Sequence, residues 1–308
     1  MNRLMKALGL VTAGWAIWRL FGPDLQPTYQ GVQERPIHVP GRSVFVGHRE
    51  FFVREVGPTD APPLVLIHGW AFNSEMTFFQ VIPALAERYR VIIPDLRNHG
   101  KSDRIRGRFE IEDLADELAG ILDALGISKA AFFGYSLGGL VAQTFAFRYP
   151  DRVERLMLGA TAARPVARLR PATRVAFWLG RAGARFSKKE PVRFTYTFLT
   201  ASRLLDPAYG RWMWASLLDR DPTLYYESGN AIWRYDARKW VGRLRAPTMI
   251  VIPTEDRVMV AAAQYELARL LPDARVVEIE GAGHESILSR PEEYVAAIEA
   301  YLDGDSDD

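Results

Sequence analysis

FFGYSLGGLVAQ, residues 132–143, places one serine between glycines directly after an apolar run. A nucleophilic serine needs exposure at the end of a strand, and the sharp strand-to-helix turn that exposes it tolerates only small residues two places to either side. Gly134 and Gly138 stand at those two places around Ser136. The stretch therefore predicts a nucleophile elbow of Gly134, Tyr135, Ser136 and Gly138. The alternative is an ordinary glycine-rich turn that happens to contain a serine.

Strand-like and helix-like segments alternate on both sides of this turn. Continuous apolar runs predict strands that are covered on both faces, and apolar residues at helical spacing predict the helices between them. The expected strands are residues 64–67, 90–96, 129–136, 153–160, 247–253 and 274–281. The expected helices are residues 78–89, 111–127, 137–150, 261–272 and 291–302. Residues 42–57, interrupted by Gly47, predict an antiparallel pair of strands ahead of them.

The alternation stops between residues 164 and 246, which predicts an inserted helical cap. This segment has no comparable buried strand; it carries tryptophans and phenylalanines among arginines, with prolines as breaks. The fold class is therefore α/β, with a mostly parallel, doubly wound sheet and an inserted cap. The expected parts are an apolar N-terminal helix (1–22), a first core segment (23–163), the cap or lid (164–246), a second core segment (247–304) and an acidic tail (305–308).

A serine nucleophile needs a histidine to take its proton and an acid to orient that histidine. His284 follows the last expected strand, and Asp256 follows the strand before it, so loops at the carboxyl edge of the sheet can bring both to Ser136. The chain order Ser136, Asp256, His284 is the order expected of a triad on such a sheet. Glu255 is the alternative acid.

Five short motifs identify the chain as similar to the α/β-hydrolase superfamily over residues 42–304. They are HGW (68–70), DLRNHGKSD (95–103), GYSLGG (134–139), TEDRV (254–258) and GAGH (281–284). The resemblance implies a sheet of about eight strands, an oxyanion hole made by the backbone N–H groups of Trp70 and Leu137, and a structural role for His68. Asn98 and Thr254 depart from the pattern, because glycine often stands at both places in similar proteins.

The resemblance implies two-step acyl transfer through an acyl-enzyme on Ser136, with no metal or organic cofactor. We expect a carboxylesterase or monoacylglycerol-type lipase that acts on apolar acyl substrates, because aromatic residues of the cap suit an apolar pocket. Those aromatics suit a small core of the cap equally well. The alternatives are a soluble hydrolase of small acids, such as an enol-lactone or carbon–carbon bond hydrolase or a perhydrolase, and an acyltransferase or non-hydrolytic ligand-binding protein.

The amino-acid composition limits the kinds of cofactor and partner that the protein can have. The 308-residue chain has no cysteine, which excludes disulfides, thiol catalysis and cysteine-bound metals. Residues 164–245 contain 17 Lys and Arg against 6 Asp and Glu, so a basic block lies inside an otherwise acidic chain. By default its arginines are solvated helix faces, but they also permit attraction to anionic lipid headgroups. We expect no nucleic-acid partner, because the block shows no binding motif.

The N-terminus predicts association with a membrane. Arg3 and Lys6 precede an apolar stretch, residues 7–18, that as a helix is about 18 Å long against the roughly 30 Å core of a bilayer. An uncleaved anchor or interfacial helix is the first interpretation, which makes the protein membrane-associated and otherwise cytoplasmic. The alternatives are a cleaved signal, although no small-x-small cleavage site follows, and a helix packed on the protein's own surface.

Overall fold

A computed structural model of the chain describes residues 36–70, 72–165, 181–182 and 209–304. These residues fall into two compact units. Residues 36–165 and 227–304 form the larger one, called here the core unit. The described residues of the smaller unit include helix α8 (Gly210–Leu218) and the first turn of α9 (Pro222–Arg234), a helix that continues into the core unit.

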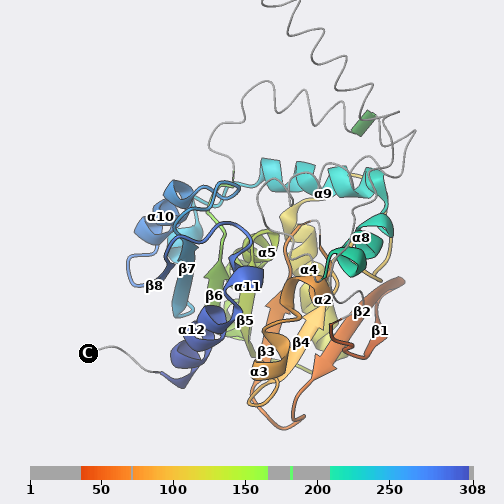
Figure 1. Cartoon of the computed structure of the whole chain (residues 1–308), viewed down its shortest axis with the longest axis horizontal. Coiled ribbons are helices and arrows are strands. Elements are labelled where there is room, and N and C mark those ends of the chain that lie inside the picture. Colours follow the sequence, from red (N-terminus) through yellow and green to blue (C-terminus); the bar gives the residue numbers. More distant parts are fainter. Residues whose placement is uncertain (1–35, 71, 166–180, 183–208, 305–308) are drawn as a thin grey trace, which may run out of the picture. The chain divides into compact units, whose positions relative to one another are not determined.

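Eight strands of the core unit form one sheet in the order β1-β2-β4-β3-β5-β6-β7-β8 (Figure 1). Their bounds are β1 Gly41–Val46, β2 Arg49–Val56, β3 Pro63–Ile67, β4 Arg90–Pro94, β5 Ala130–Tyr135, β6 Val153–Gly159, β7 Thr248–Pro253 and β8 Arg275–Ile279. Strands β4, β3, β5, β6, β7 and β8 run parallel to one another, and β2 is antiparallel to both β1 and β4. The predicted mostly parallel sheet of about eight strands is confirmed.

The antiparallel pair at one edge follows from its turn. Val46 of β1 pairs with Arg49 of β2, which leaves the two residues Gly47 and His48 to reverse the chain. Gly47 has φ 61°, a left-handed conformation that glycine adopts without the steric cost that a Cβ brings. The glycine that interrupts the alternating sequence is therefore the first residue of the hairpin turn, and the predicted strand pair is confirmed.

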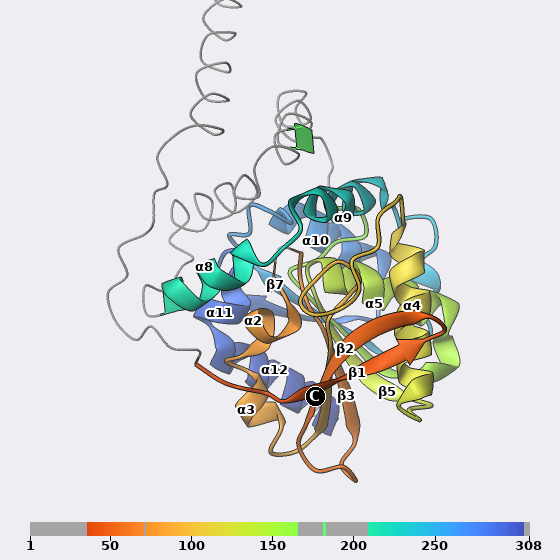
Figure 2. The same cartoon turned by 90° about the vertical axis from the view of Figure 1, so that its right-hand side faces the viewer.

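Helices cover both faces of the sheet, as Figure 2 shows. The longer ones are α4 (Ile111–Ala124), α5 (Leu137–Arg148), α10 (Ala261–Leu270) and α12 (Pro291–Asp303), with the short α11 at Ser286–Ser289. Successive side chains of a strand point to opposite faces, so Val65 and Ile67 pack in the layer with α4, α5 and α10, whereas Leu64 and Leu66 pack in the layer with α12. This burial on both faces explains the continuous apolar runs of the central strands.

The helix predicted for residues 78–89 is wrong in its extent. The chain instead forms two short helices, α2 (Ser74–Phe78) and α3 (Ile82–Leu85). Pro83 stands in the first turn of α3, where its missing N–H removes no intrahelical bond. Proline is tolerated there but not in the interior of one long helix, so the chain starts a new helix at this point.

About half of the predicted cap, residues 166–180 and 183–208, lies outside the described residues. The described part holds α8, α9 and a 3₁₀ turn at Val241–Arg243. Residues 231–241 contribute apolar side chains to the core unit, and Trp240 stacks on Phe147 with 4.6 Å between ring centroids. Trp240 therefore packs against the core, while the boundaries 164–246 stay a prediction.

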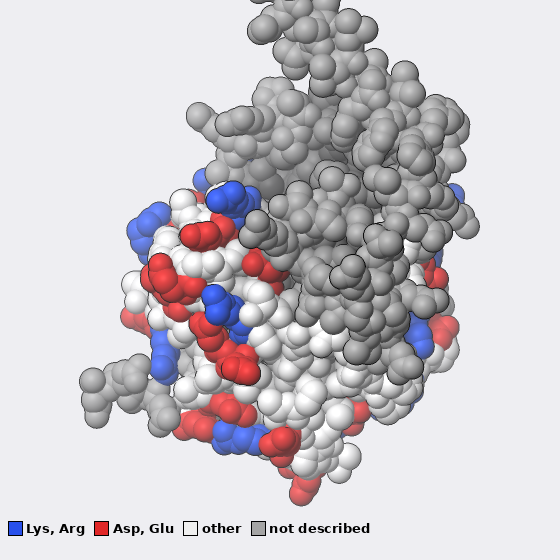
Figure 3. Space-filling view, viewed as in Figure 1, with Lys and Arg blue, Asp and Glu red and all other residues white. Residues whose placement is uncertain are grey.

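Three described arginines of this segment in the core unit form ion pairs. Arg234 lies 2.8 Å from Glu110, and Arg238 and Arg164 both contact Asp236. On the face drawn in Figure 3, basic and acidic residues of the described part are interspersed rather than separated by sign. These three arginines therefore belong to mixed, solvated surface, which was the default interpretation of the basic block.

The N-terminal segment 1–22 and the tail 305–308 lie outside the described residues, so their predicted roles stay predictions. Within the part of the chain that the structure describes, every helix is too short or too polar to span a membrane.

Replacing Phe132 by alanine tests the packing of the sheet. Its side chain is fully buried in β5, 4.7 Å from the ring of Phe145, so we expect the free energy of unfolding to fall by about 3–5 kcal/mol. Denaturant titration measures the loss. Phe45→Ala is the matched control, because that side chain is 62% exposed and its removal should change stability by less than about 1 kcal/mol. Equal losses in both variants would contradict this arrangement.

Candidate active site

Ser136 occupies a strained turn between β5 and α5. Its backbone has φ 55° and ψ −114°, and among the described non-glycine residues only Asn98 and Ala160 also have positive φ. Two hydrogen bonds hold the turn: the N–H of Ser136 donates to the carbonyl of Gly159 at 2.9 Å, and the hydroxyl of Thr161 donates to the carbonyl of Ser136 at 2.9 Å. The surrounding structure thus imposes a conformation that serine alone disfavours.

The glycines around Ser136 are required by close backbone contacts. A Cβ placed on Gly134 would lie 2.4 Å from the carbonyl oxygen of Gly138, and one on Gly138 would lie 1.9 Å from the carbonyl oxygen of Ile67. Both obstacles are backbone atoms, which cannot rotate away as a flexible side chain can. Glycines two places before and after Ser136 are therefore needed because the first turn of α5 packs closely against β5 and β3.

The three residues predicted for a triad form one hydrogen-bonded chain. The Nε2 atom of His284 lies 3.0 Å from the hydroxyl oxygen of Ser136, and its Nδ1 atom lies 2.8 Å from Oδ2 of Asp256. The Asp256 side chain is fully buried and that of His284 is 17% exposed, so the imidazole is the member that solvent reaches. The alternative acid, Glu255, is exposed.

Asp256 is held by donors on both of its carboxyl oxygens. Oδ1 accepts the backbone N–H groups of Val258 at 2.8 Å and Met259 at 2.9 Å, and Oδ2 accepts the side-chain amide of Gln264 at 2.9 Å. Since the carboxyl group acts as acceptor in all of these bonds, Nδ1 of His284 is the donor toward it, and Nε2 is left as the acceptor facing Ser136.

The sequence interpretation missed Gln264, which lies on α10. The available signal was a polar residue on the buried face of a helix, between Ala263 and Leu267.

The loop that carries His284 is fixed by a second group of hydroxyls. Tyr135 donates to the backbone carbonyl of His284, and its oxygen lies 3.3 Å from the hydroxyl of Ser286, which is 2.6 Å from that of Tyr294 on α12. Burial raises the pKa of Tyr135 and the pKa of Tyr294, so both phenols stay protonated and able to donate. The elbow's own tyrosine thereby ties the nucleophile turn to the histidine loop. Ser286 and Tyr294 were not predicted as site residues.

The two groups predicted for an oxyanion hole lie beside Ser136. Leu137 is the first residue of α5, where a backbone N–H has no intrahelical acceptor. Trp70 follows Gly69, and a Cβ on Gly69 would lie 3.5 Å from the Cβ of Ser136. Both segments therefore approach the nucleophile position, and the role of their N–H groups stays a prediction.

His68 belongs to the support of this site rather than to its chemistry. Its Nδ1 donates to the carbonyl of Gly69 at 2.8 Å, and its Nε2 accepts the N–H of Leu96 at 3.0 Å. Both ring nitrogens are thus engaged with backbone, in the neutral Nδ1–H form. Burial lowers the pKa of His68, despite the attraction of Asp95 for its charged form. The structural role implied by the resemblance fits this geometry.

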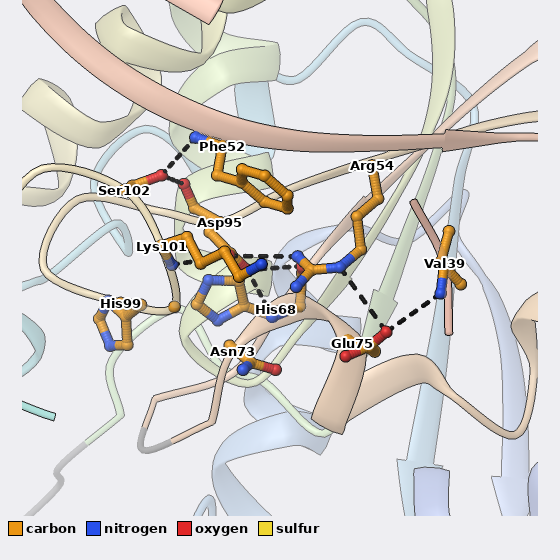
Figure 4. A network of polar contacts seen from close by, with 12 residues as sticks. Val39, Phe52, Arg54, His68, Asn73, Glu75, Asp95, His99, Lys101 and Ser102 are labelled. Carbon is orange, nitrogen blue, oxygen red and sulfur yellow. Dashed lines mark hydrogen bonds and ion pairs between the residues drawn. The ribbon is translucent and has the colours of Figure 1, made fainter. Parts of the chain in front are cut away.

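A buried ionic network lies next to His68 (Figure 4). Asp95 accepts the N–H and the hydroxyl of Ser74 at 3.0 and 2.6 Å, and its Oδ2 lies 3.1 Å from Nη1 of Arg54. Burial by itself raises the pKa of Asp95, but the charge of Arg54 and these hydrogen bonds hold it below its usual value. Glu75 lies 3.9 Å from Arg54 and accepts the N–H of Val39. The network joins β2, β4 and α2 beneath the loop that carries Trp70.

The two departures from the family pattern are accommodated locally. Asn98 has φ 66°, the left-handed conformation in which asparagine is tolerated, and its side chain exchanges two hydrogen bonds with the backbone of Ile105. Thr254 accepts the N–H of Gly281 on its hydroxyl at 2.9 Å. Neither residue distorts the loops that carry Ser136, Asp256 and His284.

Among the described residues, no group of three or more His, Asp or Glu is placed to hold a metal ion.

Comparisons with known proteins identify the family of this chain. The sequence profile of the family described as alpha/beta hydrolase fold matches residues 62–291. A pimeloyl-[acyl-carrier protein] methyl ester esterase of Neisseria meningitidis is 31% identical over 255 residues, 82% of this chain and 96% of that protein. A magnesium-chelatase 30 kDa subunit of Rhodobacter capsulatus is 31% identical over 78% of this chain and 86% of its own. Among solved structures, the enol-lactonase from Burkholderia xenovorans LB400 superposes with TM-score 0.73 at 25% identity, covering 85% of this chain and 99% of that one.

His68 gives the site a pH-dependent stability. The pKa of His68 is lower in the folded chain than in the unfolded chain, where it is about 6.5. Between these two pKa values the unfolded chain binds one proton more than the folded chain does. The free energy of unfolding therefore falls as the pH drops below about 6.5, by at most about 1.4 kcal/mol per pH unit. His68→Asn should flatten this slope, measured by denaturant titration from pH 7 to pH 5. The exposed His48, replaced by glutamine, should leave it unchanged. An unaltered slope in His68→Asn would refute the assignment.

Proposed function

The chain belongs to the alpha/beta hydrolase fold family, and from this premise we propose that it is a serine hydrolase that cleaves carboxylic esters through an acyl-enzyme. One observation carries the proposal: the hydrogen-bonded chain from Ser136 through His284 to the buried Asp256. A relative named as an esterase, which aligns along 96% of its own length, supports the choice of ester bonds.

In the first step His284 removes the proton of Ser136 as its oxygen attacks the ester carbonyl. The acceptor nitrogen Nε2 already lies 3.0 Å from that hydroxyl, within the range of direct proton transfer. The buried Asp256 fixes the imidazole through Nδ1 and stabilises its charged form. The N–H groups of Trp70 and Leu137 stabilise the negative oxygen of the tetrahedral intermediate.

His284 then acts as an acid to complete acylation, and as a base again in deacylation. Protonated His284 gives its proton to the departing alcohol, which leaves the acyl group on Ser136. A water molecule then loses a proton to the neutral His284 and attacks the carbonyl of the acyl-enzyme. As the bond to Ser136 breaks and the acid leaves, His284 returns this proton to the serine oxygen. We place the entry of that water at His284, because its side chain is 17% exposed.

Within this class we propose a carboxylesterase or monoacylglycerol-type lipase that acts on apolar acyl groups. The aromatic residues of the predicted cap support an apolar pocket, apart from Trp233, Tyr235 and Trp240, which pack against the core. A hydrolase of small cyclic or enol esters is the second candidate, because the superposed enol-lactonase shares the fold over 85% of this chain. A non-hydrolytic role is the third candidate, because one relative is named as a magnesium-chelatase subunit.

Labelling of Ser136 tests the nucleophile. A fluorophosphonate should add one adduct to the wild-type protein, measured by intact mass, and none to Ser136→Ala. Hydrolysis of p-nitrophenyl esters should fall roughly 10³- to 10⁶-fold in the same variant, since the remaining groups bind substrate but cannot form the acyl-enzyme. Esters of two to sixteen carbons and an enol-lactone then separate the first two candidates by their kcat/KM values.

The result that rejects a serine hydrolase is a folded wild-type protein with no adduct and no turnover, which would favour the non-hydrolytic role. Adduct formation without release of acid would instead favour an acyltransferase. Ser43→Ala is a suitable control, because that serine is exposed on β1, and it should keep both the adduct and the turnover.

We also propose that residues 1–22 hold the protein at a membrane surface, on the strength of their apolar sequence. Removing them should abolish sedimentation with vesicles of mixed neutral and anionic lipid while the hydrolysis of a water-soluble ester stays within about twofold of the full chain. Sedimentation that is the same with and without the segment rules out this anchor.

A further inference from the structure

We propose that Gln264 is a positioning residue of this site, which fixes the carboxylate of Asp256 against His284 and limits how strongly the imidazole holds a proton. The inference rests on the proposed function and adds a residue that neither the motifs nor the triad geometry requires. Gln264 lies on α10, eight positions beyond Asp256, and is completely buried.

The orientation of the Gln264 amide is determined by its two neighbours. Its Nε2 lies 2.9 Å from Oδ2 of Asp256 and 2.6 Å from the backbone carbonyl of Met259. Both neighbours are acceptors, so the NH₂ end must face them and the carbonyl end must point away. The side chain therefore donates two hydrogen bonds, one to the carboxylate and one to the loop that carries it.

Gln264 and His284 share one oxygen of Asp256. The other oxygen, Oδ1, is fixed by the backbone N–H groups of Val258 and Met259. Without the amide of Gln264, Oδ2 would keep His284 as its only partner among the described residues, and the carboxylate could pivot about Oδ1. The amide thus sets the direction from which Oδ2 meets the imidazole.

The same hydrogen bond changes the charge that His284 experiences. A donor to a carboxylate spreads its negative charge and weakens its attraction for a neighbouring imidazolium. With Gln264 in place, His284 releases its proton more readily than it would beside a carboxylate that only the two backbone N–H groups hold. Removal of the amide should therefore raise the pH at which the histidine becomes a base.

Stability alone does not account for a glutamine here. Its Oε1 atom is buried and accepts no hydrogen bond from the described residues. A buried acceptor without a partner destabilises a fold, and an apolar residue on this face of α10, between Ala263 and Leu267, would avoid that penalty. The NH₂ end of Gln264 does make hydrogen bonds, and one of them is to Asp256.

Gln264→Met tests the inference, because methionine has a similar length and no donor. The titratable groups around His284 are Asp256 at its Nδ1, Tyr135 at its backbone carbonyl and the adjoining Glu285, and the substitution changes none of them. We expect kcat for a p-nitrophenyl ester to fall roughly 10-fold with little change in KM. We expect the acidic limb of the kcat/KM profile to move up by roughly half to one pH unit.

Gln143→Met is the matched control. Gln143 is also completely buried, its Nε2 also donates to backbone carbonyls, and its Oε1 also accepts no hydrogen bond from the described residues. It contacts no member of the triad, so its loss should lower stability without moving the acidic limb. Gln264→Leu is the second variant if Gln264→Met does not fold.

An acidic limb that stays at its wild-type position in a folded Gln264 variant overturns the inference, whatever happens to stability. That failure is distinct from failure of the proposed function, in which the wild-type protein itself shows no turnover and no adduct on Ser136.

Discussion

The backbone of Ser136 is the constraint on which the rest of the site depends. At φ 55° the chain reverses between β5 and α5 within one residue, a conformation that costs on the order of 1–3 kcal/mol and persists only because neighbouring elements impose it. The start of α5 lies against the carbonyl of Ile67 in β3, and the end of β6 holds the turn through Gly159 and Thr161. Since β3 also leads into the loop of Trp70, the same contacts that strain the serine place that loop beside it.

Two polar networks then fix the partners of Ser136 from opposite sides. One joins Arg54, Asp95 and His68 beneath the loop of Trp70, and the other joins Tyr135, Ser286 and Tyr294 behind His284. Both are buried, where each hydrogen bond is stronger than in water and a lost partner is costly. The loops of the site are therefore held by hydrogen bonds and ion pairs in the core, although connecting segments are generally the mobile parts of a fold.

Much of the fold could be predicted because its signals are local. The central strands appear in the sequence as apolar runs. The glycines around Ser136 are required by close contacts between the end of β5, the start of α5 and β3. The helix predicted for residues 78–89 was wrong because helical periodicity outweighed Pro83, which starts a new helix.

The residues that the sequence did not reveal as part of the site, Gln264, Ser286 and Tyr294, act through bonds whose partners are set by the packing of α10 and α12. Periodicity can say that such side chains are buried, but not which atom they face. In the segment predicted as a cap, aromatic residues suit an apolar pocket and a small core equally well, so the sequence does not identify the acyl and alcohol groups of a substrate.

The separation of 148 positions between Ser136 and His284 has a consequence for biosynthesis. When the ribosome has finished β5 and α5, the nucleophile turn has all of its local sequence, yet the base, the acid and the tyrosine of α12 that supports the histidine loop have still to be translated. Until then, Ser136 lacks the contacts with His284 and Asp256 on which the proposed function rests. Under the proposed function, ester hydrolysis therefore requires β7, β8 and α12 to be packed with the first part of the core, and its appearance reports that this packing is complete.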